Sequence, residues 1–129
     1  MTTDLWMLVY CCTLALLSPA LYLVGRFGAA GGMEWLMGNR DSKLEVPEWT
    51  DRAVRAHSNL IESLVPFAAL VLVAHTAGLA NETTALGATV FFWARVLYVP
   101  VYTAGLQPWR TLIWFAGLVG QLVILGQLI

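Results

Sequence analysis

The chain has 129 residues, of which 59% are hydrophobic and only 12% charged, and its mean hydropathy is +0.71. Soluble domains carry about twice that charged fraction, so the composition excludes an ordinary soluble globular domain. A formal net charge of −1 provides no basic surface, and we expect no nucleic-acid partner. Because a membrane-spanning helix needs about 20 apolar residues, this length accommodates four spans and no separate soluble domain.

The first predicted element is a helix over residues 5–25. Its apolar run is longer than the hydrophobic region of a signal peptide, and it is preceded by Asp4 with no Lys or Arg. We therefore predict a retained first helix. Cys11 and Cys12 are neighbours inside this run, project about 100° apart on a helix, and are interpreted as small apolar side chains.

A polar stretch follows, and then three further apolar runs. Residues 26–50 are predicted to form a loop, and the remaining helices are predicted at 51–80, 84–106 and 109–129. Thr83 and Thr84 are candidate N-caps for the third helix, and Pro108 suits the start of the fourth. The predicted fold is thus all-α, a single transmembrane domain over residues 1–129 built as a four-helix bundle in the lipid bilayer.

The basic residues predict the orientation of this bundle. Five of them lie in or beside the first loop and Arg110 lies at the third, whereas the second turn and both termini have none. By the positive-inside rule the first and third loops are cytoplasmic and both termini are outside. The five residues at the first loop are Arg26, Arg40, Lys43, Arg52 and Arg55.

Polar side chains inside two of the predicted spans indicate a site. Arg55, Asn59 and Glu62 fall within about 60° of one another on the second helix. Arg95, Tyr98 and Tyr102 do the same on the third helix. The depth of each stripe can be counted from the turn between these helices at ~1.5 Å per residue. Both stripes then lie in the cytoplasmic half of the membrane. We therefore predict a cationic cleft open to the cytoplasm, with Arg55 and Arg110 at its mouth and one acid inside it.

Each of these residues also has a purely structural interpretation. Glu62 and Arg95 are expected to neutralise each other as a buried ion pair, which is compatible with a functional role. Tyr98 and Tyr102 suit ordinary membrane-interface aromatics. The two histidines, His57 and His75, lack the spacing of metal ligands, and no metal is expected.

Two motifs resemble one known family. The stretch from Arg52 to Glu62, R-A-V-R-A-H-S-N-L-I-E, is followed by Pro66 and Phe67 and resembles the signature of the MAPEG superfamily. These are membrane-associated proteins of eicosanoid and glutathione metabolism, including microsomal glutathione transferases. The stretch from Ala94 to Tyr102 is similar to the third-helix pattern of that family, A-R-x-x-Y-x-x-x-Y, and the resemblance extends over the whole chain.

The resemblance implies a homotrimer, in a bacterial inner membrane, with glutathione bound between subunits near the cytoplasmic face. It further implies that Arg110 stabilises the glutathione thiolate and that Arg26 is a further basic position. The residues implied to contact glutathione are Arg55, Asn59, Glu62, Arg95, Tyr98 and Tyr102. Ser58 and Ser63 differ from some active members, and the long Gly-rich first loop differs from the short Pro-rich loop of eukaryotic members.

Three functions follow as hypotheses. The first is a glutathione-dependent transferase or peroxidase acting on a lipophilic electrophile or hydroperoxide. The second is a non-catalytic membrane subunit or ligand-binding scaffold that keeps the fold and its internal polar pairs. The third is small-molecule transport, which four short helices without an inverted repeat disfavour. Arg110 favours the first, because a purely structural bundle has no need of it.

Overall fold

The computed structural model describes all residues, 1–129, and contains helices and no strands. Four of its helices, counting α1 and α2 as one span, are long and apolar enough to cross a membrane, which confirms the predicted all-helical class. The helices are α1 (Thr3–Leu17), α2 (Pro19–Phe27), α3 (Gly32–Met37), α4 (Glu48–Thr76), α5 (Glu82–Thr103) and α6 (Gln107–Leu125).

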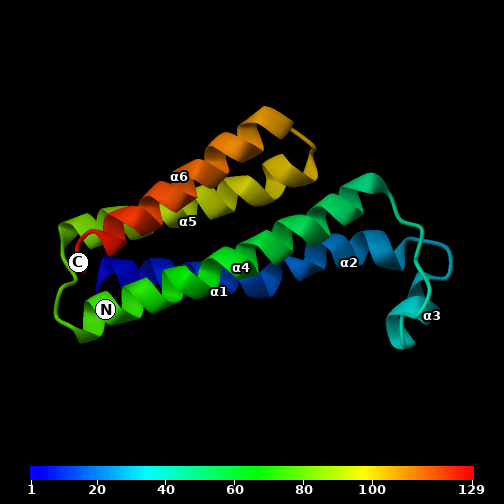
Figure 1. The fold of residues 1–129 in the computed structure, drawn as a ribbon. Helices are drawn as coiled ribbons and strands as arrows, with labels where there is room; N and C mark the ends of the chain where they lie inside the picture. The colour runs from blue at the N-terminus through cyan, green and yellow to red at the C-terminus, as the bar shows by residue number, and fades with distance from the viewer.

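The first span is divided into α1 and α2 at Ser18, because Pro19 has no N–H with which to continue the helix. The carbonyl of Ala15, which residue 19 would otherwise bond, instead accepts a hydrogen bond from Ser18 Oγ at 3.3 Å. Both helices nevertheless run in the same direction along α4, so the pair crosses as one span of 25 residues (Figure 1).

The bundle is layered, with α5 at its centre. Helix α5 packs against α1, α4 and α6 (Figure 1). Both termini and the α4–α5 turn lie at one end, called here the termini end. The opposite end, which carries α3 and the α5–α6 turn, is called the loop end.

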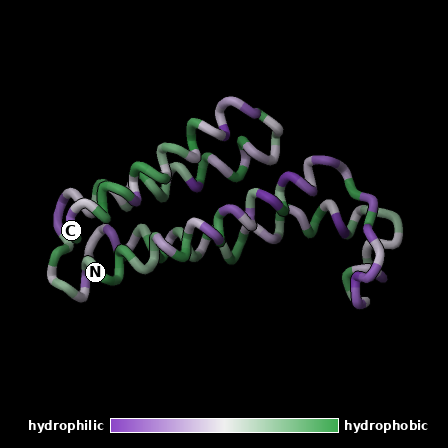
Figure 2. The backbone as a smooth tube through the Cα atoms, viewed as in Figure 1, coloured by the Kyte–Doolittle hydropathy of each residue, from purple (hydrophilic) through white to green (hydrophobic).

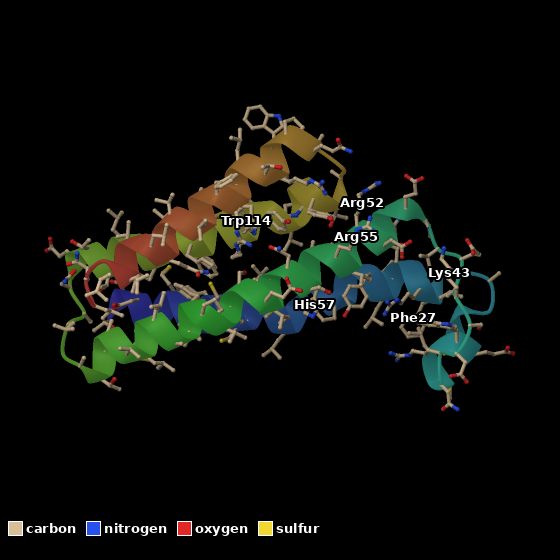
Figure 3. All side chains as sticks on the ribbon, viewed as in Figure 1. Phe27, Lys43, Arg52, Arg55, His57 and Trp114 are labelled. Atoms are coloured by element: carbon tan, nitrogen blue, oxygen red, sulfur yellow. The ribbon has the colours of Figure 1, made fainter.

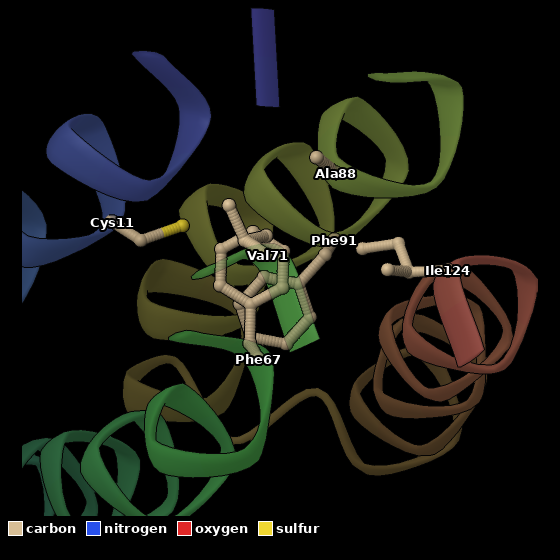
Figure 4. Packing of buried hydrophobic residues seen from close by; sticks show 6 residues of the cluster. All are labelled: Cys11, Phe67, Val71, Ala88, Phe91 and Ile124. Carbon is tan, nitrogen blue, oxygen red and sulfur yellow. The ribbon is translucent and has the colours of Figure 1, made fainter. Parts of the chain in front are cut away.

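The apolar core lies toward the termini end and draws on all four spans. Its centre is the stack of Phe67 on Phe91, whose ring centroids are 4.0 Å apart. The other members of this buried cluster are Cys11, Val71, Ala88 and Ile124 (Figure 4). Most apolar side chains lie outside this core, and Leu16, for example, is 81% exposed. Hydrophobic segments, green in Figure 2, run along every span. Such an apolar exterior suits contact with lipid.

The N-terminus of α5, at the turn that follows α4, is capped by a residue that the sequence analysis did not single out as a cap. Asn81 is the N-cap of α5 and accepts hydrogen bonds from the backbone N–H groups of Thr83 and Thr84. The prediction that a threonine would be the N-cap was wrong, because Thr84 is the N3 residue that completes the capping box. The Thr84 hydroxyl also contacts Asp4 Oδ2 at 2.9 Å, which joins this turn to α1.

The segment between the first two spans contains an additional element. The six-residue helix α3 lies within residues 26–50, where the sequence predicted only a loop. Gly31 precedes it with φ +72°, a backbone conformation that glycine adopts without strain. At the α5–α6 turn, Pro108 lies in the first turn of α6, as predicted.

Candidate functional site

The predicted polar stripes meet in a cleft bounded by α4, α5 and α6. Two neighbouring cavities of about 230 and 270 Å³ lie along it and share Asn59 and Trp114 in their walls. The first, called here the inner cavity, is lined by Glu62 and Arg95 among others. The second, called here the outer cavity, is lined by Tyr98, Tyr102, Arg110 and Thr111 in addition to the two shared residues.

Arg95 is the structural centre of the cleft. Its side chain extends from α5 and is only 1% exposed, although it carries a charge. The guanidinium donates to Asn59 Oδ1 at 2.9 Å and, at the longer distances of 3.4 and 3.5 Å, to Ser63 Oγ and the carbonyl of Trp114. Its Nε–H has no hydrogen-bond partner. Arg95 therefore joins α4 to α6 through neutral groups alone.

Small residues on α6 make room for this guanidinium. A β-carbon at Gly117 would overlap the Arg95 side chain. One turn further along, Gly120 lies against the backbone of Gly87 and allows α5 and α6 to approach closely. Helix α6 therefore packs on α5 closely enough for its carbonyl at Trp114 to face Arg95.

The predicted ion pair between Glu62 and Arg95 is not formed. The only ion pair in the protomer joins Arg52 to Glu48 at 3.4 Å. Glu62 lines the inner cavity but is exposed, and its carboxylate lies beyond 4 Å from the Arg95 guanidinium. The prediction was wrong because helical spacing places residues on a common face without fixing side-chain direction. Asn59, one turn away, contacts the guanidinium instead.

The outer cavity has an aromatic and cationic wall. The rings of Tyr98 and Tyr102 lie with centroids 5.4 Å apart, one turn apart on α5. The guanidinium carbon of Arg110, which comes from the start of α6, lies 4.7 Å from the centroid of Tyr102. The guanidinium carbon of Arg95, which lines the inner cavity, lies 5.0 Å from the centroid of the Tyr98 ring. Two cations thus flank a pair of phenols, each of which is a hydrogen-bond donor.

Two of the predicted site residues lie outside these cavities. Arg55 is exposed on α4, nearer the loop end than Trp114, and lines neither cavity (Figure 3). Arg26 lies at the end of α2, where its guanidinium carbon is 4.8 Å from the Tyr22 ring and 5.2 Å from the Trp35 ring. The two cavities therefore bring together the other six predicted residues. Glu62 and Arg95 line the inner cavity, Asn59 lines both, and the outer cavity adds Tyr98, Tyr102 and Arg110.

Sequence reasoning missed most of the α6 wall. Trp114, Leu118 and Gln121 line the inner cavity, and Gln121 Nε2 donates to the Ser63 carbonyl at 3.0 Å. These positions follow Arg110 at spacings of three and four residues, which is the period of one helix face. That period is a signal the sequence contains, although the apolar character of the run conceals it.

The arrangement is suited to binding an anionic molecule that also carries hydrogen-bonding groups. A buried guanidinium with no carboxylate partner favours an anion nearby. Arginine binds carboxylates through parallel hydrogen bonds, and the neighbouring phenols and amide can bind further polar groups. Each cavity alone is smaller than the roughly 300–1,000 Å³ of typical ligand pockets.

A chain with four helices that can span a membrane is an integral membrane protein, and this one has a polar cleft among three of its spans. A sequence model of the MAPEG family matches residues 5–129, and the chain belongs to this family. Membership places it among the membrane proteins of eicosanoid and glutathione metabolism. No curated protein and no solved structure gave a significant match to the chain.

Proposed function

We propose that this protein is a membrane-bound glutathione-dependent transferase or peroxidase acting on lipophilic electrophiles or hydroperoxides. The observation that carries the proposal is the position of Arg95, a buried cation beside two cavities with no carboxylate within 4 Å. A ligand that brings its own anionic groups would supply the missing counter-charge. Family membership makes glutathione the first candidate, because the family is associated with glutathione in general.

Glutathione matches the cleft group by group. It has two carboxylates, an ammonium and a thiol, and arginines bind carboxylates well. We assign one carboxylate to Arg95 in the inner cavity, the other to Arg55, which lies on α4 outside both cavities, and the ammonium to Glu62. Asn59, Tyr98 and Tyr102 would contribute hydrogen bonds from the shared wall and the outer cavity. Arg26 is the remaining basic position of the proposed site, and no metal is required.

Arg110 is assigned to the sulfur. A thiol with a pKa near 8.5 is mostly protonated at neutral pH, and an adjacent guanidinium favours the thiolate, which is the nucleophile. In conjugation the thiol proton passes to solvent and the sulfur forms a bond to carbon as the leaving group departs. In peroxide reduction, two glutathione molecules and one hydroperoxide give glutathione disulfide, an alcohol and water. The lipophilic substrate would enter from the bilayer.

We further propose that the site is completed in a homotrimer. Charged side chains in a span are costly when they face lipid, yet Glu62 and Arg55 are exposed on α4 in the single protomer. A neighbouring copy packed on this side would cover both and enlarge the small cavities. The proposed orientation places the loop end in the cytoplasm and the termini outside, in a bacterial inner membrane, with residues 1–129 forming one domain.

Calorimetric titration of glutathione into the purified protein in detergent tests the binding step. We expect saturable binding in the wild type and its loss in Arg55→Ala. Arg40→Ala is the matched control, because Arg40 is an exposed arginine in the loop, where it stacks on Trp35. Failure of the folded wild type to bind glutathione would contradict the proposal.

The alternative is a non-catalytic scaffold of the same fold. It is favoured by the fact that each arginine of the cleft already has a protein contact, as in Arg110 stacked on Tyr102. The two functions are separated by turnover of an aryl halide with glutathione. Tight glutathione binding without any conjugation or peroxide reduction would favour the scaffold.

A further inference from the structure

The short helix α3 has two opposite faces of different character. Met33 and Met37 lie one turn apart and within about 40° of each other, whereas Trp35 lies about 160° from both. The two methionines are 55% and 81% exposed, and Trp35 is partly buried.

The Trp35 face attaches α3 to the end of the first span. The guanidinium carbon of Arg26 lies between the Tyr22 ring at 4.8 Å and the Trp35 ring at 5.2 Å. Trp35 Nε1 also donates to the carbonyl of Ser42 at 2.6 Å. The attraction between a guanidinium and the face of an aromatic ring stabilises such contacts. Trp35 thereby fixes which side of α3 faces outward, and that side carries Met33 and Met37.

The position of α3 along the chain places it at the membrane boundary. The first span has 25 residues, which is about 37 Å of helix and longer than the ~30 Å hydrocarbon layer. Its last residue, Phe27, is exposed, and only four residues separate it from Gly32 at the start of α3. Figure 1 shows α3 at the loop end, turned across the direction of the spans and displaced to the side away from α5 and α6.

We propose that α3 is an interfacial helix that lies on the membrane surface, with Met33 and Met37 inserted into the boundary between lipid headgroups and acyl chains. The occupant of this face is the bilayer itself, because the first span ends at Phe27 and the four residues that follow it cannot carry α3 far from the membrane. Charges around α3 are mixed, with Arg40 and Lys43 offset by Glu34, Asp41 and Glu45. Insertion therefore depends on the apolar face and not on anionic lipid. The proposal is independent of whether glutathione binds.

The depth of the two methionines can be measured with nitroxide labels in phosphatidylcholine nanodiscs. The background is the full chain with Cys11→Ala and Cys12→Ala, which removes both native thiols. Labels are introduced through Met33→Cys, Met37→Cys and, as the aqueous control, Asn39→Cys. For each label, the rate of collision with oxygen is divided by the rate of collision with a water-soluble nickel chelate. We expect this oxygen-to-nickel ratio to be several-fold higher at positions 33 and 37 than at position 39. A ratio equal to that at 39 would overturn the proposal, and so would low collision with both reagents, which indicates cover by protein.

A second pair of variants tests the role of Trp35. With Trp35→Ala, the oxygen-to-nickel ratio at position 33 should fall toward that of position 39, because α3 is no longer held on Arg26. Trp35→Phe keeps an aromatic ring for the stack and should retain the wild-type ratio. An unchanged ratio in Trp35→Ala would show that α3 is not oriented by this contact.

Discussion

The buried guanidinium of Arg95 on α5 donates to the side-chain oxygen of Asn59 on α4 at 2.9 Å. Of the hydrogen bonds that join a side chain of α4 to a side chain of α5 it is the shortest, and it places a cation against a neutral amide. Asn59 is therefore both a wall of the two cavities and the principal partner of their central charge.

The first prediction concerns this bond. Asn59→Ala leaves a buried charge without its best acceptor, so we expect the free energy of unfolding to fall by about 1–3 kcal/mol. Thermal unfolding in detergent measures the change. Ser63→Ala is the matched control and should cost less, because Ser63 Oγ lies 3.4 Å from the guanidinium. Equal midpoints for the two variants would contradict the assignment.

The second prediction concerns the space that α6 leaves for Arg95. Gly117→Ala places a methyl group where the guanidinium lies, so Arg95 must shift or α6 must move away. Overpacking of this kind destabilises by about 1–3 kcal/mol. Gly126→Ala is the control, since Gly126 is exposed and a β-carbon there meets nothing closer than ordinary contact. Similar unfolding temperatures for both variants would argue against a tight Arg95 site.

The third prediction concerns Glu62, which has no ion-pair partner in the protomer. Glu62→Gln should leave the unfolding temperature nearly unchanged, while glutathione affinity falls because the ammonium loses its counter-charge. Calorimetry and thermal unfolding of the same preparation separate the two effects. A marked loss of stability with intact binding would instead indicate a partner for Glu62 in a neighbouring subunit.

The fourth prediction concerns Arg110. If it stabilises the sulfur anion, Arg110→Ser should weaken conjugation greatly while glutathione affinity stays close to wild type. The reason is that only interactions stronger in the transition state than in the bound state increase turnover. Ultraviolet absorbance of bound thiolate, compared at matched occupancy, is the direct measurement. Equal thiolate signals in the two proteins would remove Arg110 from the mechanism.

The fifth prediction concerns orientation. In the background without native thiols, an impermeant thiol reagent applied to intact cells should modify a cysteine introduced at Asn81 and not one at Lys43. The expectation rests on the basic residues of the first loop. Labelling at position 43 with none at position 81 would reverse the orientation.

Hydropathy and helical period determined much of this architecture from the sequence alone. Long apolar runs predict spans because lipid offers no hydrogen bonds to an exposed backbone. The period of 3.6 residues was enough to place Tyr98 and Tyr102 beside Arg95 on one face of α5, where the structure has them. These are local properties, which depend on neighbours along a single helix.

Only the tertiary structure decided which groups meet across helices. The partner of Arg95 is Asn59 and not Glu62, because side-chain direction and the approach of α6 at Gly117 select among residues on a common face. The part of the cleft formed by Trp114 and Gln121 likewise depends on how α6 packs on α5. Helix α3 owes its placement to the stack of Trp35 on Arg26, a contact between residues that no helical period relates.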